Sequence, residues 1–439
     1  MTAIITLLQK NWRQISILAA LALILAGAVF ISLTLPPRTI VMATGPKGGA
    51  NYELGERYRE ILAKSGVTLE LRPTSGSVEN LELLRDPSSG VGVAFVQGGV
   101  GDKAEFPGIE SLGVVAYEPL WLFYRGETGA KLQWLAGRRI SIGPEGSGSR
   151  ALALDILTTT RLKGIVGETF DYAPALAAEK LMSGDIDAAF IVTSWESPVV
   201  QTLLKAKGIE LGDFTRADAL VALYPFLNKL TLPAGVVDLL TNRPPADVTM
   251  LAPMASLAVR GDLNSAVQFL LLTAATAVHS GPGIFQKAGE FPAAESIDFP
   301  LSGDAQRFFK SGRPFLQQYL PFWLATLAER AILVFVPLIA LMYPLFRVFP
   351  SLYHWLMQSK IERLYAEMRA IEATMQNDAR ETGVKRSNAE LDLLELRASR
   401  LNLPAAYDSA LYTLRWHIAL LRDRFKLVSP SDMARSGEP

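Results

Sequence analysis

Short apolar runs alternate with helical patterns from about residue 39 to residue 312. Apolar runs of four to seven residues predict strands, and the segments of 3.6-residue period between them predict helices. The predicted strands are 39–44, 67–72, 91–97, 112–117, 139–142, 188–192 and 256–259, and helices are expected to begin near Asn51, Ser77, Ser147, Ala175 and Asn264. This alternation is typical of an α/β domain with largely parallel strands.

One strand–helix–strand step is used twice in this region, ending in the strands at 91–96 and 187–192. We expect the chain to cross into a second lobe near residues 123–137 and to return near 250–260. Two lobes with two crossovers form a hinge, and closure about a hinge around a ligand is characteristic of periplasmic binding proteins. In open α/β sheets the ligand lies beyond the carboxyl ends of the strands.

Residues 15–35 carry no charge, and Lys10 and Arg13 precede them. As a helix this stretch is about 31 Å long, enough to cross the hydrocarbon core of a bilayer. The alternative is a cleaved signal peptide, whose apolar region is usually shorter. The preceding positive charges predict that residues 1–37 form a cytoplasmic stub and signal anchor, with residues 38–318 outside.

A second apolar stretch covers residues 331–346, with aromatic residues on both sides. Its charge-free part is only about 24 Å long as a helix, and it contains Pro337 and Pro344. Membrane-spanning helices tolerate such prolines, so we predict a second span within residues 319–350. Arg347, Lys360 and Arg363 then return the tail to the cytoplasm. The alternative is a buried helix of a soluble domain.

The tail, residues 351–439, has apolar residues at helical spacings of three and four. The three seams are Ile361, Leu364, Met368, Ile371 and Met375; Leu391, Leu394 and Leu401; and Leu411, Leu414, Ile418, Leu421 and Phe425. Gly383 and Pro404 are expected to separate them. Each seam is too short for a long coiled coil, so a cytoplasmic helical bundle or hairpin is predicted, with a disordered end at 431–439.

Composition and motifs exclude several classes of function. The 43 basic and 43 acidic residues balance, and no basic stripe for nucleic acid is present. The absence of cysteine excludes disulfides and thiolate metal sites. The chain has no Gly-x-Ser-x-Gly elbow, no P-loop spacing and three scattered histidines, so neither catalysis nor a cofactor or metal is expected.

Two small-residue loops each follow a predicted strand and open a helix: TGPKGGANY at 44–52 and GPEGSGS at 143–149. The first amides of a helix lack partners within the helix, and the helix dipole adds positive potential there. Each loop is therefore a natural anion site. Two of them without a catalytic group beside them predict two lobes that hold a small acid.

The candidate ligand-binding residues lie in these loops, at a further helix start and at strand ends. They are Gly48, Gly49, Asn51, Tyr52, Ser75, Ser77, Asn80, Gln97, Tyr117, Ser147, Gly148, Ser149 and Thr193. Structural roles are the alternatives: an N-cap for Ser77 or Ser147, and a positive φ for Gly148 and the other glycines. Lys47 can add charge attraction, and Arg150 is a further candidate as a carboxylate clamp.

Four stretches occur in the order and spacing of a known family: ATGPKGGANY at 43–52, TSGSVENL at 74–81, GPEGSGS at 143–149 and LMSGDIDAAF at 181–190. Over roughly residues 39–312 the chain resembles the TAXI family, the solute-binding receptors of tripartite ATP-independent periplasmic (TRAP) transporters. The resemblance implies a two-lobed, periplasmic-binding-protein-like domain of type II. The chain differs from the family at Ala50 and Asn51, where the family more often has Val-Tyr, and at Ser149, where the family has Thr.

The resemblance and the topology together predict a receptor anchored in the bacterial inner membrane, with its main domain in the periplasm or extracytoplasmic space. It would bind a small organic acid, glutamate- or dicarboxylate-like, and deliver it to TRAP-type permease subunits. The helical tail motivates one alternative, a transmembrane sensor in which closure outside repositions the spans. An enzyme with this fold is the third and least favoured hypothesis.

Overall fold

The computed structural model describes residues 12–126, 132–377, 381–401, 403 and 405–427. The chain divides into two compact units, one of residues Thr34–Glu329 and one of Met1–Leu33 together with Arg330–Pro439. Each unit is described below by itself. The larger unit holds two sheets and is the α/β domain that the sequence predicts.

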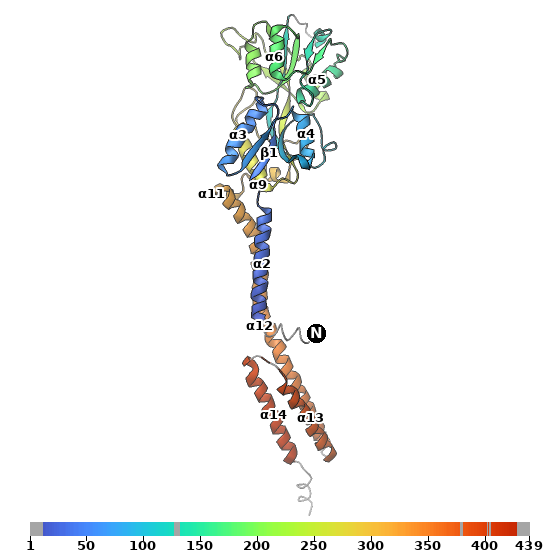
Figure 1. The fold of residues 1–439 in the computed structure, drawn as a ribbon, viewed down its shortest axis with the longest axis vertical. Coiled ribbons are helices and arrows are strands. Elements are labelled where there is room, and N and C mark those ends of the chain that lie inside the picture. The colour runs from blue at the N-terminus through green and yellow to red at the C-terminus, as the bar shows by residue number, and fades with distance from the viewer. Residues whose placement is uncertain (1–11, 127–131, 378–380, 402, 404, 428–439) are drawn as a thin grey trace, which may run out of the picture. The chain divides into compact units, whose positions relative to one another are not determined.

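The first lobe is built on the sheet that contains β1 (Thr39–Ala43), as Figure 1 shows. In the described part of the chain its strand order is β10-β11-β3-β1-β2, with β4 paired to β11. The strands are β2 (Thr68–Arg72), β3 (Val91–Gln97), β4 (Ile109–Tyr117), β10 (Leu227–Leu232) and β11 (Val248–Arg260). β1 is parallel to β2 and β3, whereas β11 is antiparallel to β3, β4 and β10.

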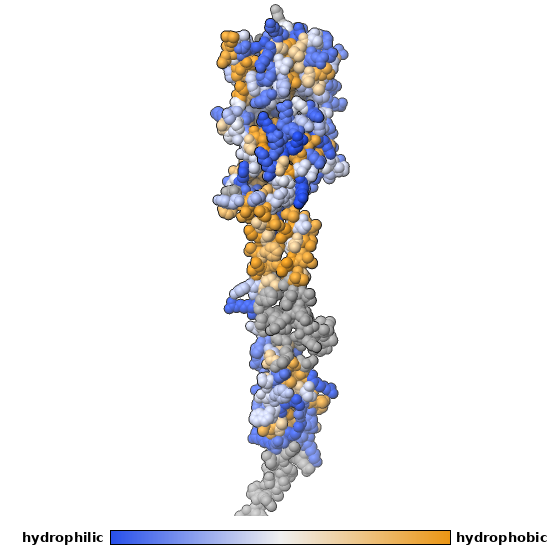
Figure 2. Space-filling view, turned by 60° about the vertical axis from the view of Figure 1, so that its left-hand side comes forward, coloured by the Kyte–Doolittle hydropathy of each residue, from blue (hydrophilic) through white to orange (hydrophobic). Residues whose placement is uncertain are grey.

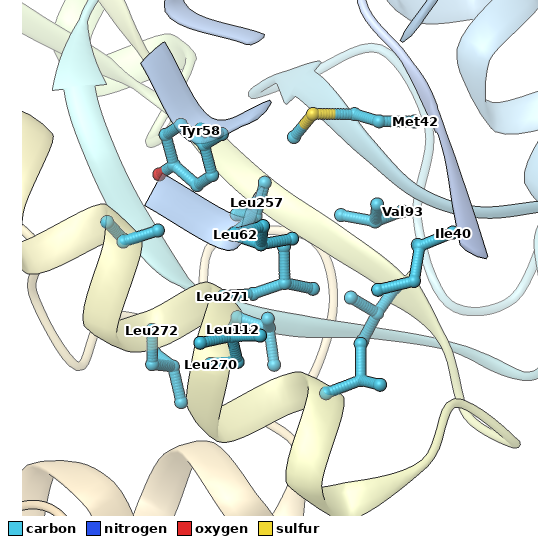
Figure 3. Packing of buried hydrophobic residues seen from close by; sticks show 14 of the residues in the cluster. Ile40, Met42, Tyr58, Leu62, Val93, Leu112, Leu257, Leu270, Leu271 and Leu272 are labelled. Atoms are coloured by element: carbon cyan, nitrogen blue, oxygen red, sulfur yellow. The ribbon is translucent and has the colours of Figure 1, made fainter. Parts of the chain in front are cut away.

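Helices α3 (Ala50–Lys64) and α9 (Ser265–His279) pack against this sheet. Figure 3 shows Tyr58 and Leu62 of α3 and Leu271 of α9 packed with Met42 and Leu257 of the strands. Each such burial is worth about 1.5–3 kcal/mol. Helix α4 (Ser77–Arg85) adds a second cluster, and the remaining elements are η1 (Pro87–Ser89), α10 (Gly303–Ser311) and α11 (Phe315–Tyr319). This core holds the carboxyl ends of β1 and β3 beside the starts of α3 and α4.

The second lobe contains the sheet β7-β6-β8-β5-β9. Its strands are β5 (Leu120–Arg125), β6 (Ile140–Ser141), β7 (Thr169–Phe170), β8 (Ala188–Val192) and β9 (Ile209–Leu211). Its helices are η2 (Leu132–Leu135), α5 (Gly148–Thr159), α6 (Pro174–Ser183), α7 (Pro198–Lys205) and α8 (Ala217–Leu223). β6 is parallel to β7 and β8, and β5 is antiparallel to β8 and β9.

Two chain crossings join the lobes. β4 ends in the first sheet at Tyr117 and β5 begins in the second at Leu120, so the first crossing is at Glu118 and Pro119. The predicted crossing at 123–137 was therefore wrong, because strand β5 follows β4 almost directly. The return is along β11, which pairs with β10 at Val248–Pro253 and with β3 or β4 from Met254 onward. This agrees with the predicted return near 250–260.

All seven predicted strands are present, two of them, 91–97 and 188–192, with the predicted bounds. All five predicted helix starts lie within one residue of those observed. The prediction of largely parallel strands was wrong in part. The crossing strands run antiparallel, and four strands of or beside the second lobe (β5, β7, β9 and β10) are absent from the predicted set.

The smaller unit contains α2 (Trp12–Thr34) and the part of α12 (Phe322–Asn377) from Arg330 onward. A Cβ on Gly27 of α2 would lie 3.0 Å from Val334 of α12, so these helices are in close contact. Their outer faces form a hydrophobic band (Figure 2). Among the described residues, the one helix long and apolar enough to cross a membrane is Phe322–Pro344, and the apolar stretch found in α2, Leu21–Thr34, is shorter.

The predicted helical tail is confirmed. The end of α12 packs with α13 (Glu381–Ser399) and α14 (Asp408–Leu427), which η3 (Ala405–Tyr407) precedes. Ile361, Leu364, Leu391, Leu394 and Leu414 are all buried there. Gly383 was wrongly predicted to separate two segments, because it lies inside α13. Pro404, residues 431–439 and the side chains of Met375 and Phe425 lie outside the described residues.

Candidate functional site

A cavity of about 190 Å³ lies between the two lobes. Residues from both of the predicted loops line it. Ten of the thirteen candidate residues are among its lining: Gly48, Gly49, Asn51, Ser75, Ser77, Gln97, Ser147, Gly148, Ser149 and Thr193. The structure therefore brings together most of a set that the sequence spreads over about 145 residues.

The first-lobe wall is made of two helix starts whose amides have no side-chain cap. Gly48 has φ of 80°, a conformation that favours glycine, and Gly49 is the N-cap of α3. Gly76, with φ of 141°, is the N-cap of α4. Neither cap residue has a side chain that could accept from the first amides of its helix, so the first amides of α3 are open to an acidic group, whereas in α4 the N of Val78 already donates to the carbonyl of Gly146.

Ser77 and Asn80 have structural roles in this wall. Ser77 is the first residue of α4 and not its N-cap, which is Gly76, and its Oγ accepts from the main-chain N of Gln97 at 3.0 Å. Asn80 is fully buried and does not line the cavity. Its Nδ2 donates to the carbonyls of Thr44 and Phe95 at 3.1 and 2.8 Å, and its Oδ1 accepts from Thr74 at 2.6 Å. The assignment of Asn80 to the ligand is thus corrected: its amide connects the segments that form the wall.

The second-lobe wall includes three further helix starts. Ser147 is the N-cap of α5, because its Oγ accepts from the N of Arg150 at 3.2 Å, and it also donates to the carbonyl of Pro144 at 2.6 Å. The Oγ of Ser149 accepts from the N of Val192 at 3.0 Å. The starts of α6 at Pro174 and of α7 at Pro198 have no side-chain cap, and their N-cap residues, Ala173 and Ser197, line the cavity.

The lobes touch beside the cavity, so the cleft is closed. The N of Val78 in the first lobe donates to the carbonyl of Gly146 at 3.2 Å, and Nε2 of Gln97 donates to the carbonyl of Gly148 at 3.2 Å. A Cβ on Gly148 would lie 2.3 Å from Oε1 of Gln97. The positive φ expected for Gly148 was wrong, and close approach of the lobes is the reason a glycine fits there.

The sequence reasoning missed Glu118, which follows β4 at the first crossing and lines the cavity. Only 7% of this residue is exposed, and its Oε1 accepts from Nδ2 of Asn51 at 2.9 Å. Burial raises the pKa of its carboxyl, and the hydrogen bond from Asn51 opposes that shift. The sequence signal for this residue was a Glu-Pro pair between two apolar strands. A charged residue at that point lies where the chain passes from one lobe to the other.

Tyr52 and Tyr117 do not line the cavity. Tyr117 borders an adjacent hollow, where its OH donates to Glu290 at 3.1 Å and burial raises its pKa to about 12. Arg150 forms an ion pair with Asp171 and is also absent from the lining, whereas Lys47 is part of it. Among the described residues, no group of three or more His, Asp or Glu could hold a metal ion.

The arrangement offers hydrogen-bond donors on most sides and one buried carboxylate. Five helices, α3 to α7, begin at the cavity, and their dipoles favour an anionic group there, although α6 and α7 begin with a proline, which has no N–H. Glu118 is the acidic side chain of the lining, and the hydroxyls of Ser147 and Ser149 already bond to the main chain. These groups suit reversible binding of a small polar molecule.

Comparison with known proteins places the chain in a family. Solved structures similar to it include a protein from Bordetella bronchiseptica RB50 (17% identity, 54% of this chain and 71% of that one, TM-score 0.37) and the periplasmic aliphatic sulphonate binding protein SsuA from Escherichia coli (15%, 56% and 73%, TM-score 0.35). A periplasmic substrate-binding protein of an ABC transporter from Coxiella burnetii is also similar (19%, 54% and 93%, TM-score 0.32). The model of the NMT1-like family matches residues 42–310, more than half of the chain, which therefore belongs to the NMT1-like family.

Proposed function

We propose that this chain is a membrane-anchored extracytoplasmic receptor that binds a small organic acid and delivers it to TRAP-type permease subunits. The observation that carries the proposal is the convergence of five helix starts on a closed cavity between two hinged lobes. Three of the cavity's features support a receptor: its small volume, its position at a hinge and its main-chain donors. The acid would be glutamate- or dicarboxylate-like.

The two apolar helices support the anchor. Large apolar side chains are exposed on α2, among them Leu21, Leu25 and Leu33, and on α12, among them Leu333 and Ile339. Outside a membrane such surfaces are unfavourable, because transfer of each apolar side chain out of water lowers the free energy. At helical rise, the apolar part of α12 is about 34 Å long, which matches a bilayer core, and α2 as a whole has the same length.

Single cysteines test this topology in a chain that has none of its own. Ser183 and Ser399 are both exposed, on α6 and α13. In intact cells from which the outer membrane has been removed, Ser183→Cys should react with an impermeant maleimide. Ser399→Cys should react only after lysis. Labelling of Ser399→Cys from outside would contradict the second span.

Ligand binding itself is tested on the full-length protein in detergent. An acid present at 100 times its Kd stabilises the folded state by about 2.7 kcal/mol, which is a clear rise in melting temperature. We expect at least one member of a panel of amino acids and di- or hydroxycarboxylates to produce it. A panel that shifts nothing would overturn the receptor proposal.

The packed helical tail favours one second candidate function, that of a transmembrane sensor. Helices α12, α13 and α14 share one buried cluster, and packed helices of this kind can change register. Removing residues 381–439 separates the two candidates. Under the transport hypothesis, uptake of the acid should persist without these residues. Under the sensor hypothesis, their removal should abolish the output signal, and uptake should be unaffected even when the whole chain is deleted.

A further inference from the structure

We propose that the ligand is a zwitterion whose cationic nitrogen pairs with Glu118, which makes it an amino-bearing acid and excludes a simple dicarboxylate. This inference rests on the proposed function and selects one of the two ligand classes that it leaves open. The observation that supports the inference is the buried carboxylate of Glu118 at the crossing between the lobes.

The position of Glu118 is fixed by both crossings. Its main-chain N donates to the carbonyl of Pro253, on the returning strand β11, at 2.9 Å. The side chain lines the cavity and is shielded from solvent, with 7% of the residue exposed. A carboxylate held at the hinge is therefore presented to whatever the closed lobes enclose.

The carboxylate of Glu118 has unused acceptor capacity. An ionised carboxylate offers about four acceptor positions, and among the described residues Nδ2 of Asn51 occupies one of them. No cationic side chain in the described part of the chain is ion-paired with it. A buried charge is normally paired, because its desolvation is costly. A bound ammonium group would supply the missing charge.

The cavity lining combines two kinds of group with opposite charge preference. Glu118 is a carboxylate that accepts from Asn51 in the first turn of α3, whereas the starts of α3 to α7 in the same lining add positive potential from their helix dipoles. Lys47, the other charged lining residue, is exposed on the glycine loop. A ligand with both a carboxylate and an amino group satisfies both kinds of group. A second ligand carboxylate beside Glu118 would be repelled.

Matched pairs of acids test this inference by calorimetry on the full-length protein in detergent. The pairs are L-glutamate with glutarate and L-aspartate with succinate, which differ by one amino group. We expect the wild-type protein to bind the amino-bearing member of the better pair at least tenfold more tightly. Glu118→Gln keeps the acceptor for Asn51 and removes the charge, so affinity for that member should fall roughly ten- to hundredfold.

Two further variants complete the design. Glu118→Asp keeps the charge and should restore part of the preference for the amino group. Glu145→Gln removes a charge of the same sign from an exposed position on the Gly143–Ser149 loop that does not line the cavity, and it should leave both affinities unchanged. The preference of the wild-type protein for the amino-bearing acid is measured without any variant. The inference can therefore be overturned even if Glu118→Gln does not fold.

The outcomes separate the inference from the proposed function. Equal or tighter wild-type binding of glutarate or succinate overturns the inference and leaves the receptor standing. So does a Glu118→Gln protein that folds and retains the wild-type preference. If neither member of either pair binds, and the wider panel also fails, both the proposed function and the inference are overturned.

Discussion

A fully buried amide, Asn80, connects three segments of the first lobe, whereas ion pairs at the surface connect separate elements of the second. The second-lobe pairs include Arg139 with Asp187 and Arg150 with Asp171. In the first lobe, the pairs Arg59–Glu56, Arg260–Asp262 and Arg307–Asp304 each join residues at most three positions apart. Its loops are thus fixed by buried hydrogen bonds, which water does not weaken.

This difference assigns different tasks to the lobes. Buried hydrogen bonds position the first-lobe wall whether or not a ligand is present, because breaking them leaves polar groups without water. Exposed ion pairs contribute little stability, so the second lobe depends on its apolar core and on small hydroxyls near the cavity. Removal of the buried first-lobe amide should therefore mainly reduce stability, and a substitution on the second-lobe wall that prevents contact with the first lobe should mainly reduce affinity.

Asn80→Ala should have the largest effect. It removes three hydrogen bonds and leaves the carbonyls of Thr44 and Phe95 without their side-chain donor, which should lower the free energy of unfolding by about 3–5 kcal/mol. Denaturant unfolding measures this change. Asn228→Ala, on half-buried strand β10, is the control and should change it by less than about 1 kcal/mol. Equal effects of both variants would contradict the role of the buried Asn80 amide in holding the first-lobe wall.

His279 should make the stability of the first lobe depend on pH. Burial, with a smaller effect from Arg57, lowers its pKa to about 4 from the ordinary 6.5. The unfolded chain therefore binds the proton more readily, so stability is full above about pH 6.5 and is lost as the pH falls toward 4. The expected loss between pH 7.5 and 5 is about 2 kcal/mol. His279→Phe should remove this part of the pH dependence, and an unchanged profile would contradict the assignment.

Gly148→Val should prevent closure of the lobes, and so reduce ligand affinity, with little change in the stability of the fold. The new side chain would meet the amide of Gln97 and break the contact between the lobes, so affinity for the acid should fall at least tenfold. Gly303→Val is the matched control, because Gly303 is also the first residue of a helix behind a serine N-cap and has open space around it. Both variants should melt within a few degrees of each other. Wild-type affinity in Gly148→Val would contradict the closed cleft.

The sequence predicted long apolar strands better than short or polar ones, for a physical reason. Strands β3 and β8 are continuous apolar runs bounded by polar residues, and such runs are found from hydrophobicity alone. β7 and β9 have two and three residues, too few for any period to appear. β10, with the sequence LNKLTL, carries three polar residues and was not recognised.

The site was predicted in outline because glycine and serine mark helix starts, and four of the five helix starts at the cavity have one of them as the N-cap. Hydrogen-bond partners could not be predicted, since Asn80 and Ser77 look the same in sequence whether they bind a ligand or the main chain. The role of Glu118 depends on where the chain changes lobes, and that position was predicted too late in the sequence.

Ser147→Ala should lower stability more than affinity. The Ser147 hydroxyl caps α5 and bonds to Pro144, so its loss should cost about 1 kcal/mol of unfolding free energy. Ser302→Ala, which removes the equivalent cap of α10, should cost the same. If the hydroxyl instead bound the ligand directly, calorimetry would show a ten- to hundredfold loss of affinity for Ser147→Ala alone.

Arg150→Ala should have the smallest effect of the series. The guanidinium pairs with Asp171 at the surface, with 29% and 55% of the two side chains exposed, and exposed pairs contribute at most about 1 kcal/mol. The side chain does not line the cavity, so affinity should stay within about twofold of the wild type, a change of under ~0.5 kcal/mol. Asp171→Asn breaks the same pair from its other side and should behave alike in both unfolding and calorimetry. A carboxylate clamp predicts a different pattern: Arg150→Ala would lose affinity at least tenfold, and Asp171→Asn would leave it intact or raise it by freeing the guanidinium. That result would move the acid's recognition from the main-chain amides of five helix starts to one side chain, and it would make the second lobe the specific half of the site.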